Sequence, residues 1–180
     1  MELQMKNITL ISGVMASGKS KMVFDLVDQF KDENKSYKLF IPECQTHIKS
    51  RAKKEILEAE QVHSAEQVIN TKADFLLIDE VQFIPVHQLK KIVESDNKAT
   101  LILVGLQKDL FNHEFKNYQY LKTVERIEHI RLHAECDFCK KAMADFSCCE
   151  KMGKNGSLLT DDGAVYKNTC VKCATERDII

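Results

Sequence analysis

Residues 8–31 read ITLISGVMASGKSKMVFDLVDQFK, and this stretch decides the fold. The segment Ile8–Ser12 is a short apolar run of the kind that forms a buried strand. Residues 13–20 contain two glycines, and Lys21–Lys31 has apolar side chains at helical spacing. The stretch therefore predicts a strand, a loop and a helix in that order.

Similar apolar runs alternate with a helical pattern further along the chain. They predict strands at Tyr37–Ile41, at Asp74–Ile78 and at Thr100–Val104, and a helix at Pro85–Ser95. Residues 50–68 are rich in charge and weakly periodic, so we expect a helical or irregular segment there. Continuous apolar strands that alternate with helices indicate an α/β fold with a mainly parallel sheet and helices on both faces.

Composition and charge limit the class of protein. The chain has 180 residues, of which 44% are hydrophobic and 29% charged, which suits one globular domain with room for a small lobe. A net charge of -1 provides no basic field for a nucleic-acid backbone. We see no export signal and no run of the ~18 apolar residues that span a bilayer. We therefore expect a soluble cytoplasmic protein with neither a nucleic-acid nor a membrane partner.

The loop after the first strand matches the phosphate-binding pattern G-x-x-x-x-G-K-[ST], with the residues Gly13, Val14, Met15, Ala16, Ser17, Gly18, Lys19 and Ser20. Its N–H groups and the following helix N-terminus would face phosphate oxygens. Lys19 would then reach the β- and γ-phosphates of ATP, and Ser20 would ligate Mg²⁺. The alternative is a glycine-rich turn with a chance lysine, and the flanking strand and helix disfavour it.

An acidic pair follows the third strand. Asp79 stands where a P-loop enzyme needs a carboxylate to hold hydrated Mg²⁺. Glu80 is a candidate to accept a proton from an attacking hydroxyl. The alternatives are that the pair only caps the next helix, or that the same residues serve an ATPase.

The character of the sequence changes near Arg131, where cysteines, lysines and glycines replace the apolar runs. We place a boundary there, between an ATP-binding domain at 1–131 and a smaller lobe at 132–180. Two C-x-x-C pairs in the lobe predict a closed, structural zinc site, with the ligands Cys136, Cys139, Cys170 and Cys173. The zinc would fix the base of the loop 140–169.

Two other interpretations of the cysteines compete with a zinc site. A redox dithiol at Cys136 and Cys139 is the rival to zinc, and two matched pairs favour zinc. A nucleic-acid zinc ribbon is a second rival, which the acidic residues of the loop disfavour. Cys44, Cys148 and Cys149 do not fit the pattern, and we expect free thiols.

Taken together, the chain resembles the thymidine kinase family of the tetrameric, zinc-containing type. The matching parts are the loop 13–20, the segment 78–83 (IDEVQF), Gly105 and Leu106, Phe115, the two C-x-x-C pairs, and Gly163 with Tyr166 between them. The match covers nearly the whole chain in the same order. It implies an α/β core that binds ATP, a zinc-held lid over a deoxynucleoside, and a homotetramer.

The resemblance also implies roles for single residues. It implies phosphorylation of a 5′-hydroxyl, most simply that of thymidine, with Glu80 as the catalytic base. Asp79 would support the metal and Gln82 would contact the cofactor. Residues near the nucleoside would be Met15, Phe83, Leu106, Phe115, Gly163 and Tyr166. Core packing is the alternative for each phenylalanine.

The chain departs from the family pattern at several positions. The family has an Asp-x-Arg after its second strand, and the segment 42–46 (PECQT) has none. Phe146 takes the position where a threonine usually faces the base, a glycine pair of the lid is reduced to Asp162-Gly163, and Val171 replaces an arginine. The nucleoside preference is therefore open, and so is an ATPase or a nucleotide-binding regulator that has lost the nucleoside pocket.

Overall fold

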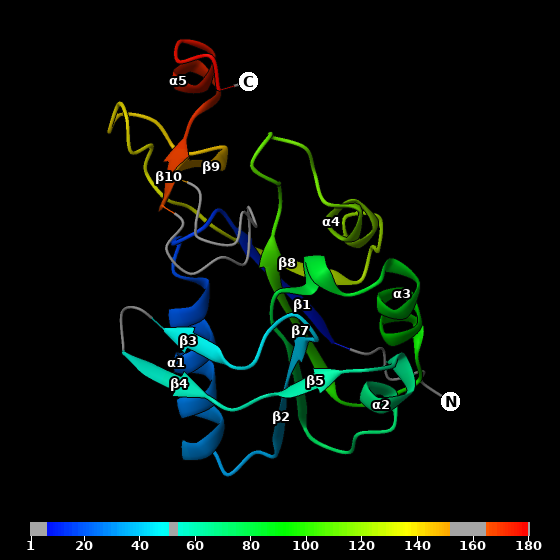
Figure 1. The fold of residues 1–180 in the computed structure, drawn as a ribbon. Coiled ribbons are helices and arrows are strands. Elements are labelled where there is room, and N and C mark those ends of the chain that lie inside the picture. Colours follow the sequence, from blue (N-terminus) through cyan, green and yellow to red (C-terminus); the bar gives the residue numbers. More distant parts are fainter. Residues whose placement is uncertain (1–6, 51–53, 152–164, 180) are drawn as a thin grey trace.

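The computed structural model describes residues 7–50, 54–151 and 165–179. Figure 1 shows an α/β domain with a small lobe at its upper left. A central sheet holds six strands, in the spatial order β5 (Glu60–Val62), β2 (Tyr37–Pro42), β6 (Phe75–Ile78), β7 (Thr100–Leu106), β1 (Ile8–Gly13) and β8 (Ile127–Leu132). Every neighbouring pair in it runs parallel. The predicted α/β class is confirmed.

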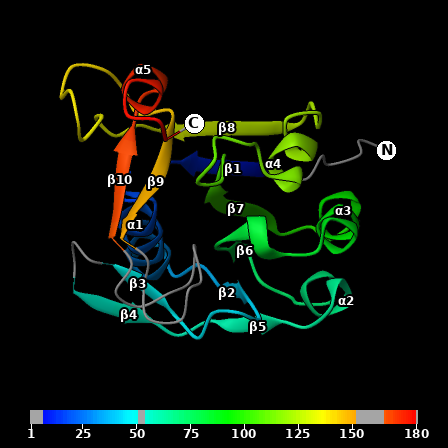
Figure 2. The same cartoon turned by 45° about the horizontal axis from the view of Figure 1, so that its top comes forward.

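Helices cover both faces of this sheet. Helix α1 (Lys19–Asp32) packs Val23, Phe24, Val27 and Phe30 against one face. Helices α2 (Ala65–Ile69), α3 (Val86–Glu94) and α4 (Lys116–Leu121) cover the other face. Figures 1 and 2 show this division, with α1 on one side and the three shorter helices on the other. Two apolar cores result, separated by the sheet.

Two regions differ from expectation. The segment 50–68 holds strand β5 and helix α2, and also β4 (Glu55–Leu57), which pairs with β3 (Ile48–Ser50). Its strands have three residues each, too few to show a period. Strand β8 was not predicted, because it is half-exposed at the sheet edge and carries charged side chains.

The lobe follows β8. It contains β9 (Phe146–Lys151), the antiparallel β10 (Val165–Thr169) and helix α5 (Val171–Thr175). Figure 2 shows this hairpin beside the end of α1 that follows the phosphate loop. The predicted boundary at Arg131 falls inside β8 and stays a prediction.

Candidate active site

The phosphate loop joins β1 to α1 and is tightly folded. Gly18 has a left-handed φ of 96°, which lets the chain turn into α1 at the next residue. A Cβ on Gly13 would collide with the side chain of Ser17 and would lie 2.6 Å from the carbonyl oxygen of Leu132. Glycine is therefore required at both positions, for different reasons.

Lys19 is buried under this loop, with 8% of its surface exposed. Its ammonium donates to the carbonyl oxygens of Val14 (2.7 Å) and Gly13 (3.3 Å). Burial lowers the pKa of Lys19, and the charges of Glu80 and Asp79 partly oppose this. The fold thus brings together the three charged residues that the sequence singled out.

The donors of the loop suit a phosphate. Ser17 Oγ is buried and has no hydrogen-bond partner among the described residues. An unpaired buried hydroxyl costs free energy, and a phosphate oxygen would satisfy it. Ser20 is half-buried in the first turn of α1. These features fit the triphosphate of ATP, and the predicted contact of Ser20 with Mg²⁺ stays a prediction.

Asp79 and Glu80 form the turn that follows β6. Asp79 is 6% exposed, and its Oδ1 accepts the N–H of Glu80 at 2.9 Å. Burial and then the charge of Glu80 raise the pKa of Asp79 to about 7. A bound cation would favour the ionised carboxylate. Asp79 therefore fits a place beside Mg²⁺.

Gln82 lies in the short 3₁₀ helix η1 (Val81–Phe83) directly after the acidic pair. Its Nε2 donates to the carboxylate of Glu80, and its Oε1 accepts the N–H of Leu106 at 3.0 Å. Both ends of the amide are therefore engaged within the protein. The predicted contact of Gln82 with ATP stays a prediction.

The residues predicted to line a nucleoside pocket come from several elements. The rings of Phe83 and Phe115 meet edge to face, with centroids 6.4 Å apart and an interplanar angle of 70°. Met15 and Tyr166 are half-buried, and Leu106 is 9% exposed at the end of β7. The structure thus brings the two phenylalanines together, and their place in a nucleoside pocket stays a prediction. Gly163 lies outside the described residues.

The expected position of Phe146 needs a correction. Phe146 is 1% exposed and packs against Cys148 and Ala174 inside the lobe. Its neighbour Ser147 instead faces the phosphate loop and accepts the N–H of Met15 at 2.9 Å. Adjacent strand residues point to opposite faces, so a shift of one residue changes which side chain reaches the site. Ser147 was not predicted as a site residue, because only the register of β9 shows which face it occupies.

The four cysteines predicted to bind zinc lie together. The Sγ atoms of Cys136, Cys139, Cys170 and Cys173 are all within 4.8 Å of one another. Tetrahedral Zn–S bonds of ~2.3 Å place sulfur atoms roughly 3.8 Å apart, so the cluster fits zinc. The lobe packs apolar side chains around it, among them Phe138. The prediction that these four cysteines could bind one metal ion together is therefore confirmed.

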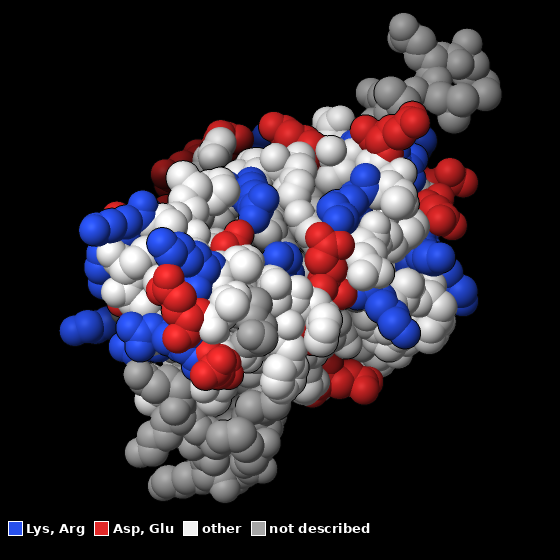
Figure 3. Space-filling model, turned by 90° about the horizontal axis from the view of Figure 1, so that it is seen from above, with Lys and Arg blue, Asp and Glu red and all other residues white. Residues whose placement is uncertain are grey.

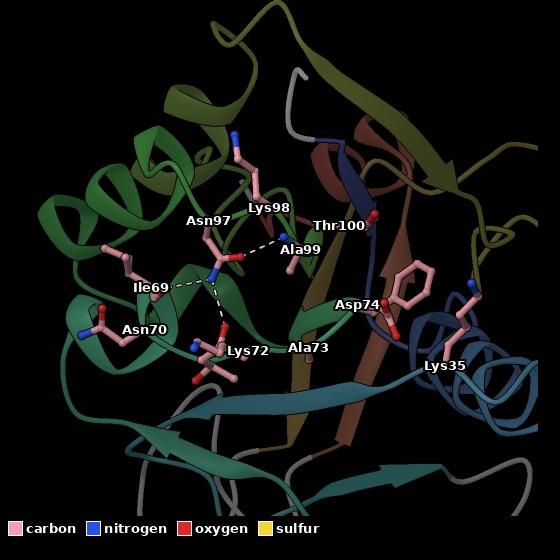
Figure 4. Close-up of a pocket in the computed structure, with 12 residues that line it drawn as sticks. Lys35, Ile69, Asn70, Lys72, Ala73, Asp74, Asn97, Lys98, Ala99 and Thr100 are labelled. Atoms are coloured by element: carbon pink, nitrogen blue, oxygen red, sulfur yellow. Dashed lines mark hydrogen bonds between the residues drawn. The ribbon is translucent and has the colours of Figure 1, made fainter. Parts of the chain in front are cut away.

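A hollow among the described residues lies at the other end of the sheet. It has a volume of about 730 Å³ and is lined by residues that precede β6 and β7, together with Lys35. In Figure 4 the amide of Asn97 points at the backbone, where it donates to Ile69 and Thr71 and accepts from Ala99. Ligands of open α/β sheets bind at the carboxyl ends of the strands, where the phosphate loop is. We therefore assign the site to the loop and not to this hollow.

The distribution of surface charge bears on whether a nucleic acid could bind. On the face seen in Figure 3, acidic and basic side chains are interspersed, and no broad surface of one sign is visible. In the described part of the chain, no helix has the length and apolar character needed to cross a bilayer. The predicted absence of a nucleic-acid partner stays a prediction.

Comparison with known proteins agrees with this geometry. The family model described as thymidine kinase matches residues 6–174, which is nearly the whole chain. A search of curated proteins gave no match. The matched range contains the phosphate loop, the acidic pair and all four clustered cysteines. The chain therefore belongs to the thymidine kinase family and is an ATP-dependent nucleoside kinase.

Proposed function

We propose that the protein transfers the γ-phosphoryl group of ATP to the 5′-hydroxyl of a deoxynucleoside, most simply thymidine. The observation that carries the proposal is the meeting of Lys19, Asp79 and Glu80 at the carboxyl ends of β1 and β6. In this proposal Lys19 would bind phosphate, Asp79 would hold the metal and Glu80 would accept the proton.

In this proposal the phosphate loop binds the triphosphate. Lys19 leaves the carbonyl oxygens of Val14 and Gly13 and donates to phosphate oxygens, and Ser17 Oγ gains its missing partner. Ser20 and Asp79 would hold Mg²⁺, which neutralises charge on the phosphates when bound. The protein thus stabilises charge and positions groups, which is most of what phosphoryl transfer needs.

The acceptor would lie between Glu80 and the aromatic pair. The rings of Phe83 and Phe115 would contact the sugar and the base, and Met15, Leu106 and Tyr166 would complete the pocket. Glu80 would accept the hydrogen bond of the 5′-hydroxyl and take its proton during transfer. Gly163 is part of the proposed lid by family resemblance.

The cysteine cluster supports a structural role for zinc. A site with four thiolates has no open position for a substrate, so its metal would hold the lobe together. No disulfide joins the cysteines of the described residues, which suits the reducing environment of the cytoplasm that we propose for the protein. A homotetramer is proposed from the family alone.

The test is ATP turnover by zinc-loaded protein with a panel of nucleosides and a control without acceptor. Formation of thymidine or deoxyuridine monophosphate supports the proposal. Loss of ATP without an acceptor would instead indicate an ATPase, and ATP binding without turnover would indicate a regulator. Glu80→Gln should abolish turnover and leave ATP binding intact, and unchanged turnover would remove Glu80 from the role of base.

A further inference from the structure

Gln82 connects the proposed catalytic carboxylate to the end of a core strand. Its amide nitrogen donates to Glu80, and its amide oxygen accepts the N–H of Leu106 at 3.0 Å. Leu106 is the last residue of β7, which is hydrogen-bonded between β6 and β1 in the sheet. The Gln82 amide thus links strand β7, which is held within the sheet, to the Glu80 side chain at the proposed reaction centre.

Packing holds this amide in one place. Gln82 is 9% exposed, and a Cβ added to Gly105 would lie 2.6 Å from its Oε1 and 2.8 Å from Val81 Cγ2. The glycine therefore allows the backbone of β7 to approach the amide closely. The hydrogen bond from the N–H of Leu106 and this close packing restrict the orientation of the planar amide, and with it the position of the nitrogen.

In the described part of the chain, no side chain besides Gln82 donates a hydrogen bond to the Glu80 carboxylate. The backbone of Glu80 is left-handed, with φ at 52°, and its N–H is bonded to Asp79. Among the described residues, the charges of Lys19, Asp79 and Cys44 interact with Glu80. Of these, Asp79 would repel an ionised Glu80, whereas an amide N–H donor stabilises a carboxylate in a defined orientation.

We propose that Gln82 is a positioning residue, which aims the Glu80 carboxylate at the acceptor hydroxyl and does not bind ATP. The inference rests on the proposed role of Glu80 as the base. Misplacing a reacting group by about 1 Å can lower a rate by roughly 100-fold. Loss of the amide should therefore reduce kcat and leave nucleotide affinity unchanged.

The first variant is Gln82→Met, which keeps the volume and removes both hydrogen bonds. We expect kcat to fall by roughly 10- to 100-fold, with the Kd for ATP and the KM for thymidine within about two-fold of wild type. Gln29→Met is the matched control, because it removes an exposed Gln–Glu hydrogen bond from α1. Weaker ATP binding with an unchanged kcat would overturn the inference and support direct contact with the cofactor.

A second variant covers the case in which Gln82→Met does not fold. Gln82→Glu keeps an acceptor for the N–H of Leu106 but replaces the donor to Glu80 with a second carboxylate, so kcat should also fall. A Gln82→Glu enzyme with normal kcat would contradict the inference.

Double mutants test most directly whether Gln82 acts through Glu80. In a Glu80→Asp background the shorter carboxylate would no longer reach the amide. Adding Gln82→Met to this background should therefore lower kcat by less than about three-fold. An equal loss in both backgrounds would show that Gln82 acts without Glu80. Full turnover by Glu80→Gln would instead refute the proposed base, whereas an inactive Glu80→Gln beside a fully active Gln82→Met refutes this inference alone.

Discussion

The N–H of Met15 in the phosphate loop donates a hydrogen bond of 2.9 Å to the hydroxyl of Ser147, 132 residues further along the chain. Ser147 in turn donates to Asn168 Oδ1 at 2.8 Å, and the N–H of Asn168 donates to Asp137 Oδ2 at 2.7 Å. Asp137 lies between two of the clustered cysteines. The cysteine lobe is therefore hydrogen-bonded to the phosphate loop through Ser147 and Asn168.

The first prediction concerns this connection. Ser147→Ala should weaken ATP binding by about two- to ten-fold, since one hydrogen bond contributes ~0.5–1.5 kcal/mol. Ser147→Thr retains the hydroxyl and should restore binding. Titration with ATP measures the effect, and Ser36→Ala is the control because it removes an exposed hydroxyl bonded to Asp74. Equal affinities for Ser147→Ala and the wild type would show that the contact does not support the loop.

The second prediction follows from the pKa of Asp79, which burial raises from 3.8 to about 7. The unfolded chain releases this proton near pH 3.8 and the folded chain near pH 7, so the wild type loses stability as the pH rises between them. Asp79→Asn does not titrate. Without Mg²⁺, the free energy of unfolding of Asp79→Asn should exceed that of the wild type. The excess should grow across this pH window and stay constant above it, at about a few kcal/mol.

Unfolding by urea at several pH values, with a chelator present, measures this difference. A constant difference between Asp79→Asn and wild type from pH 4 to pH 8 would contradict the prediction. Turnover by Asp79→Asn should be lost, because the variant lacks the charge proposed to hold Mg²⁺.

The third prediction tests the cysteine cluster. Cys136→Ser should lose bound zinc and lower the unfolding temperature by about 5 °C or more, because the metal supplies folding free energy to a lobe with few apolar residues. Cys44→Ser changes an exposed thiol outside the cluster and should keep both properties. Elemental analysis and thermal unfolding give the answer, and a Cys136→Ser protein with a full zinc content would exclude this residue as a ligand.

The central fold could be predicted because its strands are buried on both faces and read as continuous apolar runs. The phosphate loop and the acidic pair could also be found, since each depends on neighbouring residues in the chain. Strand β8 could not, because an edge strand with charged side chains lacks that pattern. The contact of Ser147 with Met15 and that of Gln82 with Leu106 depend on register and on partners 24 or more residues away, which no local pattern encodes.

The last prediction concerns Gly105, where no side chain fits without moving Gln82. A methyl group there would lie 2.6 Å from Gln82 Oε1 and 2.8 Å from Val81 Cγ2, and β7 is held by strands on both sides. Gly105→Ala should therefore displace the amide, with a loss of stability of about 1–3 kcal/mol from overpacking. It should also lower kcat at unchanged ATP affinity, because the displaced amide no longer restrains Glu80. Steady-state kinetics with urea unfolding separates the two effects, and a destabilised variant with normal kcat would show that Glu80 keeps its position without the amide.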